Sequence, residues 1–374
     1  MTSAFPLPAT DPDMLGFARK PLAQLDRLIR RHIEEGRYPG CQIALARHGK
    51  LALFRTYGDA RLEPRRVAAA DDTLWLLFSN TKVLTMAAIW SLVEDGLLSF
   101  NDRVADHIPE FASHGKDDVT IFQLATHQAG FPGANVSREA WADHARMRAE
   151  VCAFPLEWPP GSRTHYHPRA AHLTLAMVIE AVTGEDFRDV IRERVIDPLG
   201  LSRELFVGVP REEQARCADI HAPPAPDAPG DNSAEFRAAG LPHGGGFGTA
   251  RAMAAFYQMM LGYGRLGELR LFSRRMIEYV TRDFTGDRPD GYMSDIPMHR
   301  GLGPHSRGLG ERVRGLGSIG APATYGHGGV GSSYCWADPT SGVSFAYITN
   351  FVAPDPWHSA RMDRVSNLVH AAIE

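Results

Sequence analysis

The sequence predicts an α+β fold in which an antiparallel sheet, flanked by the terminal helices, carries an inserted and mostly helical lobe. Strand patterns occur near both ends of the 374-residue chain, and helical patterns dominate between them. A chain of this length buries a sizeable core. We therefore expect a sheet domain of residues 15–77 together with 300–374, a helical lobe over 78–299, and an active site at their interface.

The end segments show the periodicities of the elements that they are expected to form. Leu22, Leu25, Ile29 and Ile33 recur at helical spacing, and alternating or short apolar runs mark strands. Turn-forming residues separate these strands. The expected elements are a helix over 21–36, strands over 40–46 and 51–57, strands over 330–337 and 343–350, and a last helix over about 359–373.

Ser79 stands where a short apolar run, residues 74–78, gives way to a helical pattern that ends at Gly96. At a helix start, free backbone N–H groups and the positive end of the helix dipole favour negative charge. Lys82 follows three residues later, on the same face of the first turn. A Ser–Lys pair in this arrangement activates a hydroxyl nucleophile. The same pattern also fits a capping serine beside a lysine that extends to solvent.

The choice of lysine at position 82 favours the first interpretation. Only four of the 40 basic residues are lysines, and Lys82 is the one embedded in an apolar helix. A desolvated lysine can lose its proton, whereas arginine cannot. A second S-x-x-K pattern, Ser113 to Lys116, lies in a polar stretch with an internal glycine. We interpret this second pattern as a solvated loop.

Two further segments carry candidate site residues. A Pro-rich approach places Tyr166 in a loop just before a helix over about 169–183, and such loop positions often carry function. A tyrosine packed under the loop is the structural alternative. The run Tyr325-Gly-His327-Gly328-Gly329 precedes Val330 at an expected strand start, and its glycines allow the backbone to approach a ligand closely.

Composition excludes several classes of protein. The net charge of −4 is dispersed, so no nucleic-acid partner is expected. No apolar run is long enough to cross a membrane, and the N-terminus lacks a signal-peptide pattern, so a cytoplasmic location is expected. The four cysteines lie far apart, as is typical of buried free thiols. His165, His167 and His172 have no accompanying carboxylate cluster, so we expect no metal site and no cofactor.

Taken in order, Ser79-x-x-Lys82, Tyr166 and His327-Gly328-Gly329 resemble the motifs of serine hydrolases of the β-lactamase/penicillin-recognising fold. The chain looks most similar to class C β-lactamases and family VIII carboxylesterases over nearly its whole length. Supporting segments also resemble the family: residues 124–130, Pro160-Gly161 before the tyrosine, and residues 244–250 at a helix entrance.

The resemblance implies a role for each motif residue. Ser79 would be the acylated nucleophile, Lys82 the neutral amine that takes its proton, and Tyr166 a proton relay to the leaving group. The backbone N–H groups of Ser79 and Val330 would form the oxyanion hole. His327, Gly328 and Gly329 would bind substrate beside them. Large aromatic residues near the motifs are candidates for the wall of an apolar pocket: Trp158, Phe247 and Trp336.

Two departures from the family's motifs point toward esters. Pro168 stands where β-lactamases have the asparagine of Y-x-N, and it has no side-chain donor for an amide substrate. His327 stands where they have the lysine of K-T-G, and a neutral histidine binds a substrate carboxylate poorly. We therefore predict a serine carboxylesterase that forms an acyl-enzyme on a small-molecule ester.

Three alternatives remain open from the sequence. The same fold supports acyltransferases, including transesterases, and amide hydrolases that act on β-lactams or amino-acid oligomers. A catalytically inactive homologue that only binds a ligand is a further alternative from a different class. Residue patterns do not determine the natural substrate or the oligomeric state.

Overall fold

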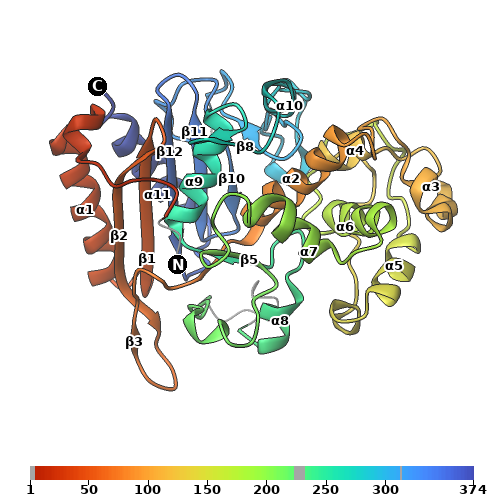
Figure 1. Ribbon diagram of the computed structural model, residues 1–374, viewed down its shortest axis with the longest axis horizontal. Coiled ribbons are helices and arrows are strands. Elements are labelled where there is room, and N and C mark those ends of the chain that lie inside the picture. The colour runs from red at the N-terminus through yellow and green to blue at the C-terminus, as the bar shows by residue number, and fades with distance from the viewer. Residues whose placement is uncertain (1–4, 223–231, 312–313) are drawn as a thin grey trace.

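The computed structural model describes residues 5–222, 232–311 and 314–374, and it has the expected mixed architecture. A seven-stranded antiparallel sheet has the strand order β3-β2-β1-β12-β11-β10-β9, so strands from the two ends of the chain pair at its centre (Figure 1). Its strands are β1 (Gly40–Arg47), β2 (Lys50–Arg61), β3 (Val67–Ala68), β9 (His305–Ser306), β10 (Tyr325–Gly329), β11 (Ser333–Asp338) and β12 (Val343–Thr349).

Helices from both ends of the chain cover one face of this sheet. α1 (Arg19–Glu34) and α11 (Trp357–His370) pack against each other and against large side chains of alternating strand residues. Ile43, Leu45 and Phe345 point to this face, as the two-residue period of a strand requires. The predicted terminal helices are therefore confirmed.

The opposite face of the sheet carries small side chains and one long helix. Ala44, Ala46 and Ala346 lie on this face, so the Ala-rich helix α9 (Ala250–Leu261) can pack closely against it. Figure 1 shows α9 across the strands, with the helical lobe beside it. The sequence assigned residues 78–299 to one helical lobe, but this assignment is wrong for α9, which belongs with the sheet.

The helical lobe is built around α2 (Thr81–Glu94), which is buried on nearly every side. A helix with apolar residues on all its faces is typical of the centre of a lobe, whereas a surface helix has one polar face. The other helices are α3 (Val104–His107), α4 (Ile121–Ala125), α5 (His144–Cys152), α6 (Ala170–Thr183), α7 (Phe187–Ile191), α8 (Ala234–Ala239) and α10 (Arg274–Val280). Short strands complete the described elements: β4 (Trp75–Leu76), β5 (Leu205–Val207), β6 (Gly246–Gly248), β7 (Arg265–Leu266) and β8 (Leu269–Arg270).

One strand boundary differs from the sequence prediction. A strand was expected over residues 330–337, but the structure has two strands, β10 and β11, with a tight turn at Val330–Ser332 between them. Gly331 in this turn has φ +61°, and a Cβ there would lie 2.7 Å from the Val352 side chain. The glycine-rich run is therefore itself a strand rather than the approach to one.

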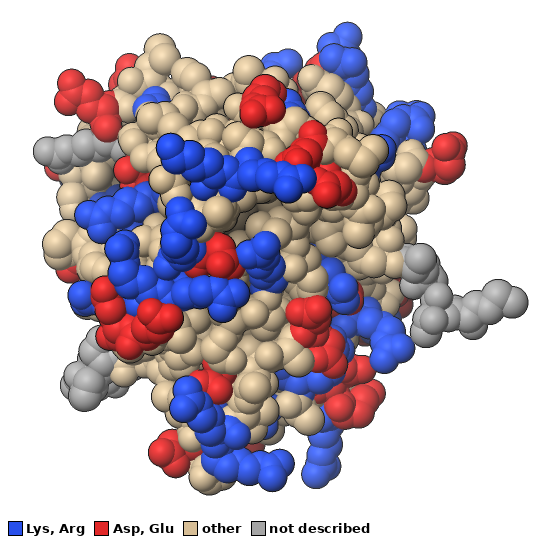
Figure 2. All heavy atoms as spheres, turned by 90° about the vertical axis from the view of Figure 1, so that its left-hand side faces the viewer, with Lys and Arg blue, Asp and Glu red and all other residues tan. Residues whose placement is uncertain are grey.

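Charged side chains are intermixed on the face of the sheet domain that carries α1 (Figure 2). Asp26 of α1 pairs with both Arg30 (2.9 Å) and Arg55 (2.6 Å), which illustrates how basic charge is compensated locally. Within the described ranges, no helix has both the length and the apolar character needed to cross a bilayer.

The second S-x-x-K segment is not the solvated loop that its sequence suggested. Ser113 is exposed, but Lys116 is fully buried, and its Nζ donates to the carbonyls of Ser113 (2.9 Å), Cys152 (2.9 Å) and Phe154 (2.7 Å). The interpretation was wrong because tertiary contacts, which a local pattern does not contain, bury the lysine. Lys116 joins two segments of the lobe.

We predict that Lys116→Met destabilises the protein without altering its chemistry. The substitution leaves three carbonyls without their donor, so the free energy of unfolding should fall by about 2 kcal/mol. Urea unfolding followed by circular dichroism measures this change. An unfolding free energy equal to that of the wild type would show that water replaces the ammonium at no cost.

Candidate active site

Ser79 lies in the 3₁₀ turn Phe78–Asn80, between strand β4 and helix α2. Phe78 has φ +47°, an uncommon value for a residue with a side chain, and this sharp bend precedes the serine directly. Ser79 faces a cavity of about 940 Å³ that lies between the helical lobe and the sheet. The bend therefore presents the hydroxyl to a space large enough for a small-molecule substrate.

Lys82 lies one turn further along the chain and is fully buried. Its Nζ is 3.1 Å from Ser79 Oγ and donates to the carbonyls of Pro168 (2.8 Å) and His243 (2.6 Å). A neutral amine has two N–H donors and one lone pair. With both donors on carbonyls, the lone pair is left for the hydroxyl proton of Ser79.

The surroundings of Lys82 favour this neutral form. Burial lowers its pKa well below the usual 10.5, and the positive charges of Arg300 and Arg169 lower it further. A deprotonated lysine within hydrogen-bond reach of a hydroxyl has the geometry of a general base. The arrangement can therefore remove the Ser79 proton during nucleophilic attack.

Tyr166 also faces the cavity, and its hydroxyl forms a hydrogen bond with Ser79. The ring lies 5.1 Å from Lys82 Nζ. Burial raises the pKa of this phenol above its usual value, although the Ser79 hydrogen bond and the Arg300 charge oppose the shift. The phenol therefore keeps its proton at neutral pH and can donate it to a leaving group.

A buried ion pair holds Tyr166 in place. Asp290 accepts the backbone N–H of Tyr166 (3.0 Å) through Oδ1, while its Oδ2 accepts from Arg300 (2.6 Å). The Arg300 guanidinium lies 4.8 Å from the centre of the Tyr166 ring, a cation–π distance. This pair positions the ring and contributes the charge that lowers the pKa of Lys82.

Strand β10 brings the glycine-rich motif to the nucleophile. A Cβ at Gly329 would lie 2.7 Å from Leu77 O and 3.0 Å from Phe78 Cβ, so only glycine permits this contact. Val330 follows directly and lines the same cavity as Ser79. The structure thus places both expected oxyanion donors at one site, and their catalytic roles stay predictions.

His327 of β10 lies beside Tyr166, with 6.1 Å between the ring centres. Burial, together with the charge of Arg300, lowers the His327 pKa to about 3, so the ring is neutral. Its Nδ1 lies 2.8 Å from the carbonyl of Gly328, which makes Nδ1 the protonated nitrogen. Nε2 is then an acceptor and cannot bind a substrate carboxylate.

Three expected pocket residues do not line the cavity, and these predictions are corrected. Trp336 packs against α11, where it is fully buried and stacks on His370 at 4.4 Å. Phe247 lies in the core under β6, and Trp158 packs on His165. Other apolar residues form the wall instead: Phe78, Trp141, Phe236, Leu241, Tyr292, Met293, Met298 and Met362.

His167, next to Tyr166, is hydrogen-bonded within the protein, whereas His172 is buried with no hydrogen-bond partner among the described residues for either ring nitrogen. His167 Nδ1 lies 2.7 Å from the carbonyl of His165, and its Nε2 accepts the Phe131 N–H (3.2 Å). Both ring nitrogens are therefore occupied. Burial also lowers the pKa values of His167 and His172, so both rings are neutral.

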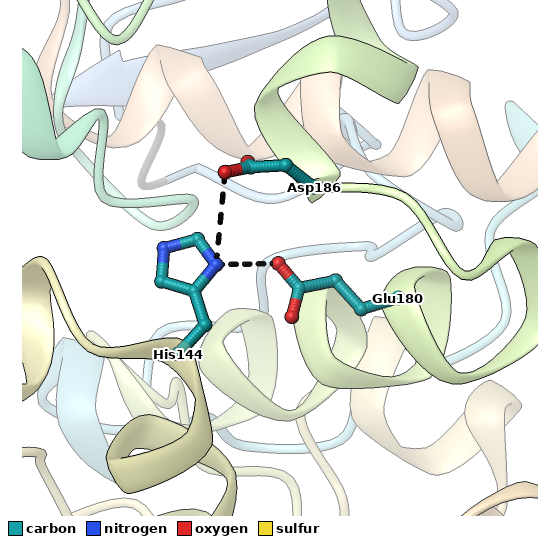
Figure 3. A group of neighbouring side chains, drawn as sticks. All are labelled: His144, Glu180 and Asp186. Carbon is teal, nitrogen blue, oxygen red and sulfur yellow. Dashed lines mark hydrogen bonds and ion pairs between the residues drawn. The ribbon is translucent and has the colours of Figure 1, made fainter.

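A separate cluster joins three helices of the lobe, as Figure 3 shows. His144 Nδ1 lies 2.6 Å from Glu180 and 3.8 Å from Asp186, and these three form the one group with metal-ligand spacing in the described residues. Both carboxylates already accept other protein donors, from the Phe187 N–H and from Arg188. The hydrogen-bonding atoms of this cluster thus already bind protein groups, and these bonds connect α5, α6 and the start of α7.

Comparison with known proteins gives a family match over most of the chain. The Beta-lactamase family model matches residues 25–366, which is most of the chain. The chain belongs to the Beta-lactamase family. Family membership makes it a serine hydrolase of the β-lactamase fold, and that fold agrees with the sheet and lobe described above.

Individual relatives carry different names. A crystal structure of a penicillin-binding protein homologue from Caulobacter crescentus is 28% identical, with a TM-score of 0.82 over 96% of this chain and 99% of that one. A family VIII carboxylesterase structure is 25% identical, with a TM-score of 0.80 over the same shares. An Escherichia coli K12 protein, named provisionally as a D-alanyl-D-alanine carboxypeptidase, is 27% identical over 92% of this chain and 85% of its own.

The sequence analysis did not identify several residues of this Beta-lactamase-family site. Asp290 and Arg300 lie more than 120 residues from Tyr166, in a segment without a recognisable motif. His243 contributes only its carbonyl, which no side-chain pattern reveals. The one available signal was the glycine-rich run after His243, which the sequence analysis connected with a helix entrance.

We predict that the activity of this hydrolase falls on acidification, because the base must be neutral. Folding lowers the Lys82 pKa, so the neutral fraction rises as pH increases through that lowered value and is lost on acidification. Lys82→Arg should reduce kcat by about 10²- to 10⁴-fold, since arginine stays protonated. A pH–rate profile and the variant's kcat measure both effects, and Lys116→Met serves as the control for loss of a buried lysine.

Proposed function

We propose that this protein is a serine carboxylesterase that acts through a covalent acyl-enzyme on Ser79. The observation that carries the proposal is the Ser79 Oγ to Lys82 Nζ distance of 3.1 Å, with two carbonyls occupying both N–H donors of a neutral amine. This arrangement leaves a lone pair where a general base needs one.

The acid and base steps follow from the two opposite pKa shifts. Lys82, with a lowered pKa, takes the Ser79 proton while the serine oxygen attacks the ester carbonyl. The backbone N–H groups of Ser79 and Val330 bind the oxyanion that forms. Tyr166, with a raised pKa, gives its proton to the departing alkoxide and is reprotonated from Lys82. Water then attacks the acyl-enzyme, and Tyr166 and Lys82 move the protons in the opposite direction, so that the acid and free Ser79 are released.

An ester fits this site better than a penicillin or a peptide. Pro168 presents its carbonyl to Lys82, so it offers a substrate amide no donor at this position. His327 presents an acceptor nitrogen rather than a cation to a carboxylate. An ester needs neither contact, because its alcohol leaves once Tyr166 protonates it. The family VIII carboxylesterase neighbour supports the same substrate class.

We predict that Ser79→Ala abolishes turnover of p-nitrophenyl butyrate and that the wild type releases free butyrate. Removing the nucleophile removes the acyl-enzyme step, and the loss should be about 10⁶-fold in kcat. Steady-state kinetics and the mass of a Ser79 adduct formed by a fluorophosphonate measure the outcome.

Two results would separate the proposal from its alternatives. A folded wild type in which the probe leaves Ser79 unmodified would indicate a homologue that only binds ligands. Capture of the acyl group by an added alcohol or amine, in place of free acid, would indicate an acyltransferase. Retained turnover by Ser79→Ala would overturn the proposal directly.

Arg169 gives the cavity wall a positive charge with no carboxylate partner among the described residues. The other wall arginines are paired, Arg300 with Asp290 at 2.6 Å and Arg314 with Asp355 at 3.1 Å. Arg169 also lowers the pKa of Lys82, so its charge acts at the catalytic centre. We therefore propose that the preferred esters carry an anionic group.

This substrate preference predicts a charge-dependent effect of Arg169→Gln. Its kcat/KM for the mono-p-nitrophenyl ester of glutaric acid should fall about tenfold, which corresponds to a charge-assisted hydrogen bond of about 1.4 kcal/mol. Loss of the Arg169 charge also raises the pKa of Lys82, so the two esters are compared on the alkaline plateau of each pH–rate profile, where the value for neutral p-nitrophenyl hexanoate should stay unchanged. Equal effects on both esters would contradict the preference, and higher salt should weaken the wild type's preference.

A further inference from the structure

Helix α11 carries a buried cation that the reaction steps above do not use. Arg361 is fully buried, and no carboxylate of the described ranges lies within ion-pair distance of its guanidinium. Its Nε and NH1 atoms have no hydrogen-bond partner. Instead, the guanidinium lies 5.3 Å from the ring of Tyr38, 5.7 Å from that of Tyr347 and 4.9 Å from that of Trp357. Cation–π attraction to three aromatic rings therefore compensates the charge in part.

The remaining nitrogen of this guanidinium binds the turn between β10 and β11. Arg361 NH2 donates to the carbonyls of Gly331 (2.7 Å) and Ser332 (3.0 Å). The Ala353 N–H donates to the same Gly331 carbonyl (2.8 Å). This turn begins at Val330, the residue whose N–H is the expected second oxyanion donor. The two bonded carbonyls belong to the two residues that follow it.

The other side of the turn is bound to the nucleophile. Asn80, which follows Ser79, donates through Nδ2 to Ser333 Oγ (3.0 Å) and to Leu77 O (3.0 Å). Gly329 contacts Leu77 and Phe78, as described above. The bend that carries Ser79 and the turn that carries Val330 thus form one connected unit. Arg361 binds this unit through the carbonyls of Gly331 and Ser332, and Asn80 binds it through Ser333.

A buried charge without a counter-ion is costly, and an apolar side chain of similar volume would fill the same aromatic cage without that cost. Three rings and two carbonyls do not fully replace water around a guanidinium. Stability alone therefore does not explain an arginine at this position. Its directional donation to two successive carbonyls is what an apolar residue lacks.

We propose that Arg361 is a positioning residue that orients the Val330 N–H toward the reacting carbonyl through the Gly331 and Ser332 carbonyls. The inference rests on the proposed function, because the Val330 N–H needs alignment only if it stabilises an oxyanion during ester hydrolysis. An oxyanion donor acts only if it is aligned before the charge develops. Loss of this alignment lowers transition-state binding while ground-state binding of the substrate is retained.

The test compares Arg361→Met with Arg361→Lys and with the wild type. Arg361→Met should lower kcat for p-nitrophenyl butyrate by about 10²-fold, the usual effect of losing one oxyanion donor, and should leave KM within threefold. Arg361→Lys keeps the charge and one donor, so it should recover part of the loss. The affinity for a trifluoromethyl ketone, which forms an oxyanion adduct with Ser79, should fall in parallel with kcat.

Lys116→Met is the matched control, because it also removes a buried cation that donates to backbone carbonyls. It should lower stability while kcat and inhibitor affinity stay unchanged. Unchanged kcat and inhibitor affinity in folded Arg361→Met would overturn the inference, as would a loss confined to KM. If Arg361→Met does not fold, Arg361→Lys decides by the same two measurements.

A second measurement separates this inference from the proposed function. The rate at which a fluorophosphonate labels Ser79 depends on the oxyanion hole but requires no ester substrate. A wild type that is labelled but hydrolyses no ester contradicts the proposed function alone. A labelling rate that is equal in Arg361→Met and the wild type contradicts the positioning role alone.

Discussion

The contact between the Lys82 amine and the Ser79 hydroxyl is the interaction on which the rest of the site depends. Burial makes the lysine a base, and the carbonyls of Pro168 and His243 turn its lone pair toward the serine. These carbonyls come from two loops that lie far apart in the sequence and both follow α2 along the chain. A free amine is therefore maintained only while three separate segments stay packed around α2.

The rigid parts of the fold explain how this packing is maintained. α2 is surrounded by apolar residues, and the bend at Leu77 and Phe78 that precedes it contacts the end of β10 at Gly329. The sheet thus supplies one wall of the site and the lobe supplies the base. Because the two bodies meet at the nucleophile itself, small changes in their packing alter the chemistry before they alter the fold.

Local patterns in the sequence predicted the parts of the site that local structure forms. Ser79 and Lys82 are three residues apart on one helix, so their proximity follows from helix geometry alone. Tyr166 was assigned through the order of the motifs that resembles the family, because its Pro-rich approach alone also fits a tyrosine packed under a loop. Asp290 and Arg300 were not, since they reach Tyr166 through tertiary contacts across more than 120 residues. The strand patterns at both ends of the chain predicted the antiparallel sheet. The position of α9 on that sheet was not predicted, because it depends on the small size of the alanines opposite it.

Aromatic pocket residues illustrate a second limit of sequence patterns. Trp336 lies in a strand that is buried on both faces, so hydrophobicity did not indicate whether its side chain reaches the cavity or packs against α11. Tyr334, on the same face of β11, lines the cavity, whereas Trp336, two residues further along, stacks on His370 of α11. The position of each residue along the strand, which its hydrophobicity does not give, therefore decided which aromatic ring reaches the cavity.

The two S-x-x-K segments show why a motif acquires its chemistry from its surroundings. Both lysines are buried and both donate to carbonyls, and burial lowers the pKa of each. Lys116 donates to three carbonyls, so all three donors of an ammonium are used and no lone pair is needed. Lys82 donates to two carbonyls, and its third direction meets a hydroxyl that can give up a proton. The number of carbonyl acceptors thus separates a structural ammonium from the amine that we propose as the catalytic base, although both residues occupy the same sequence pattern.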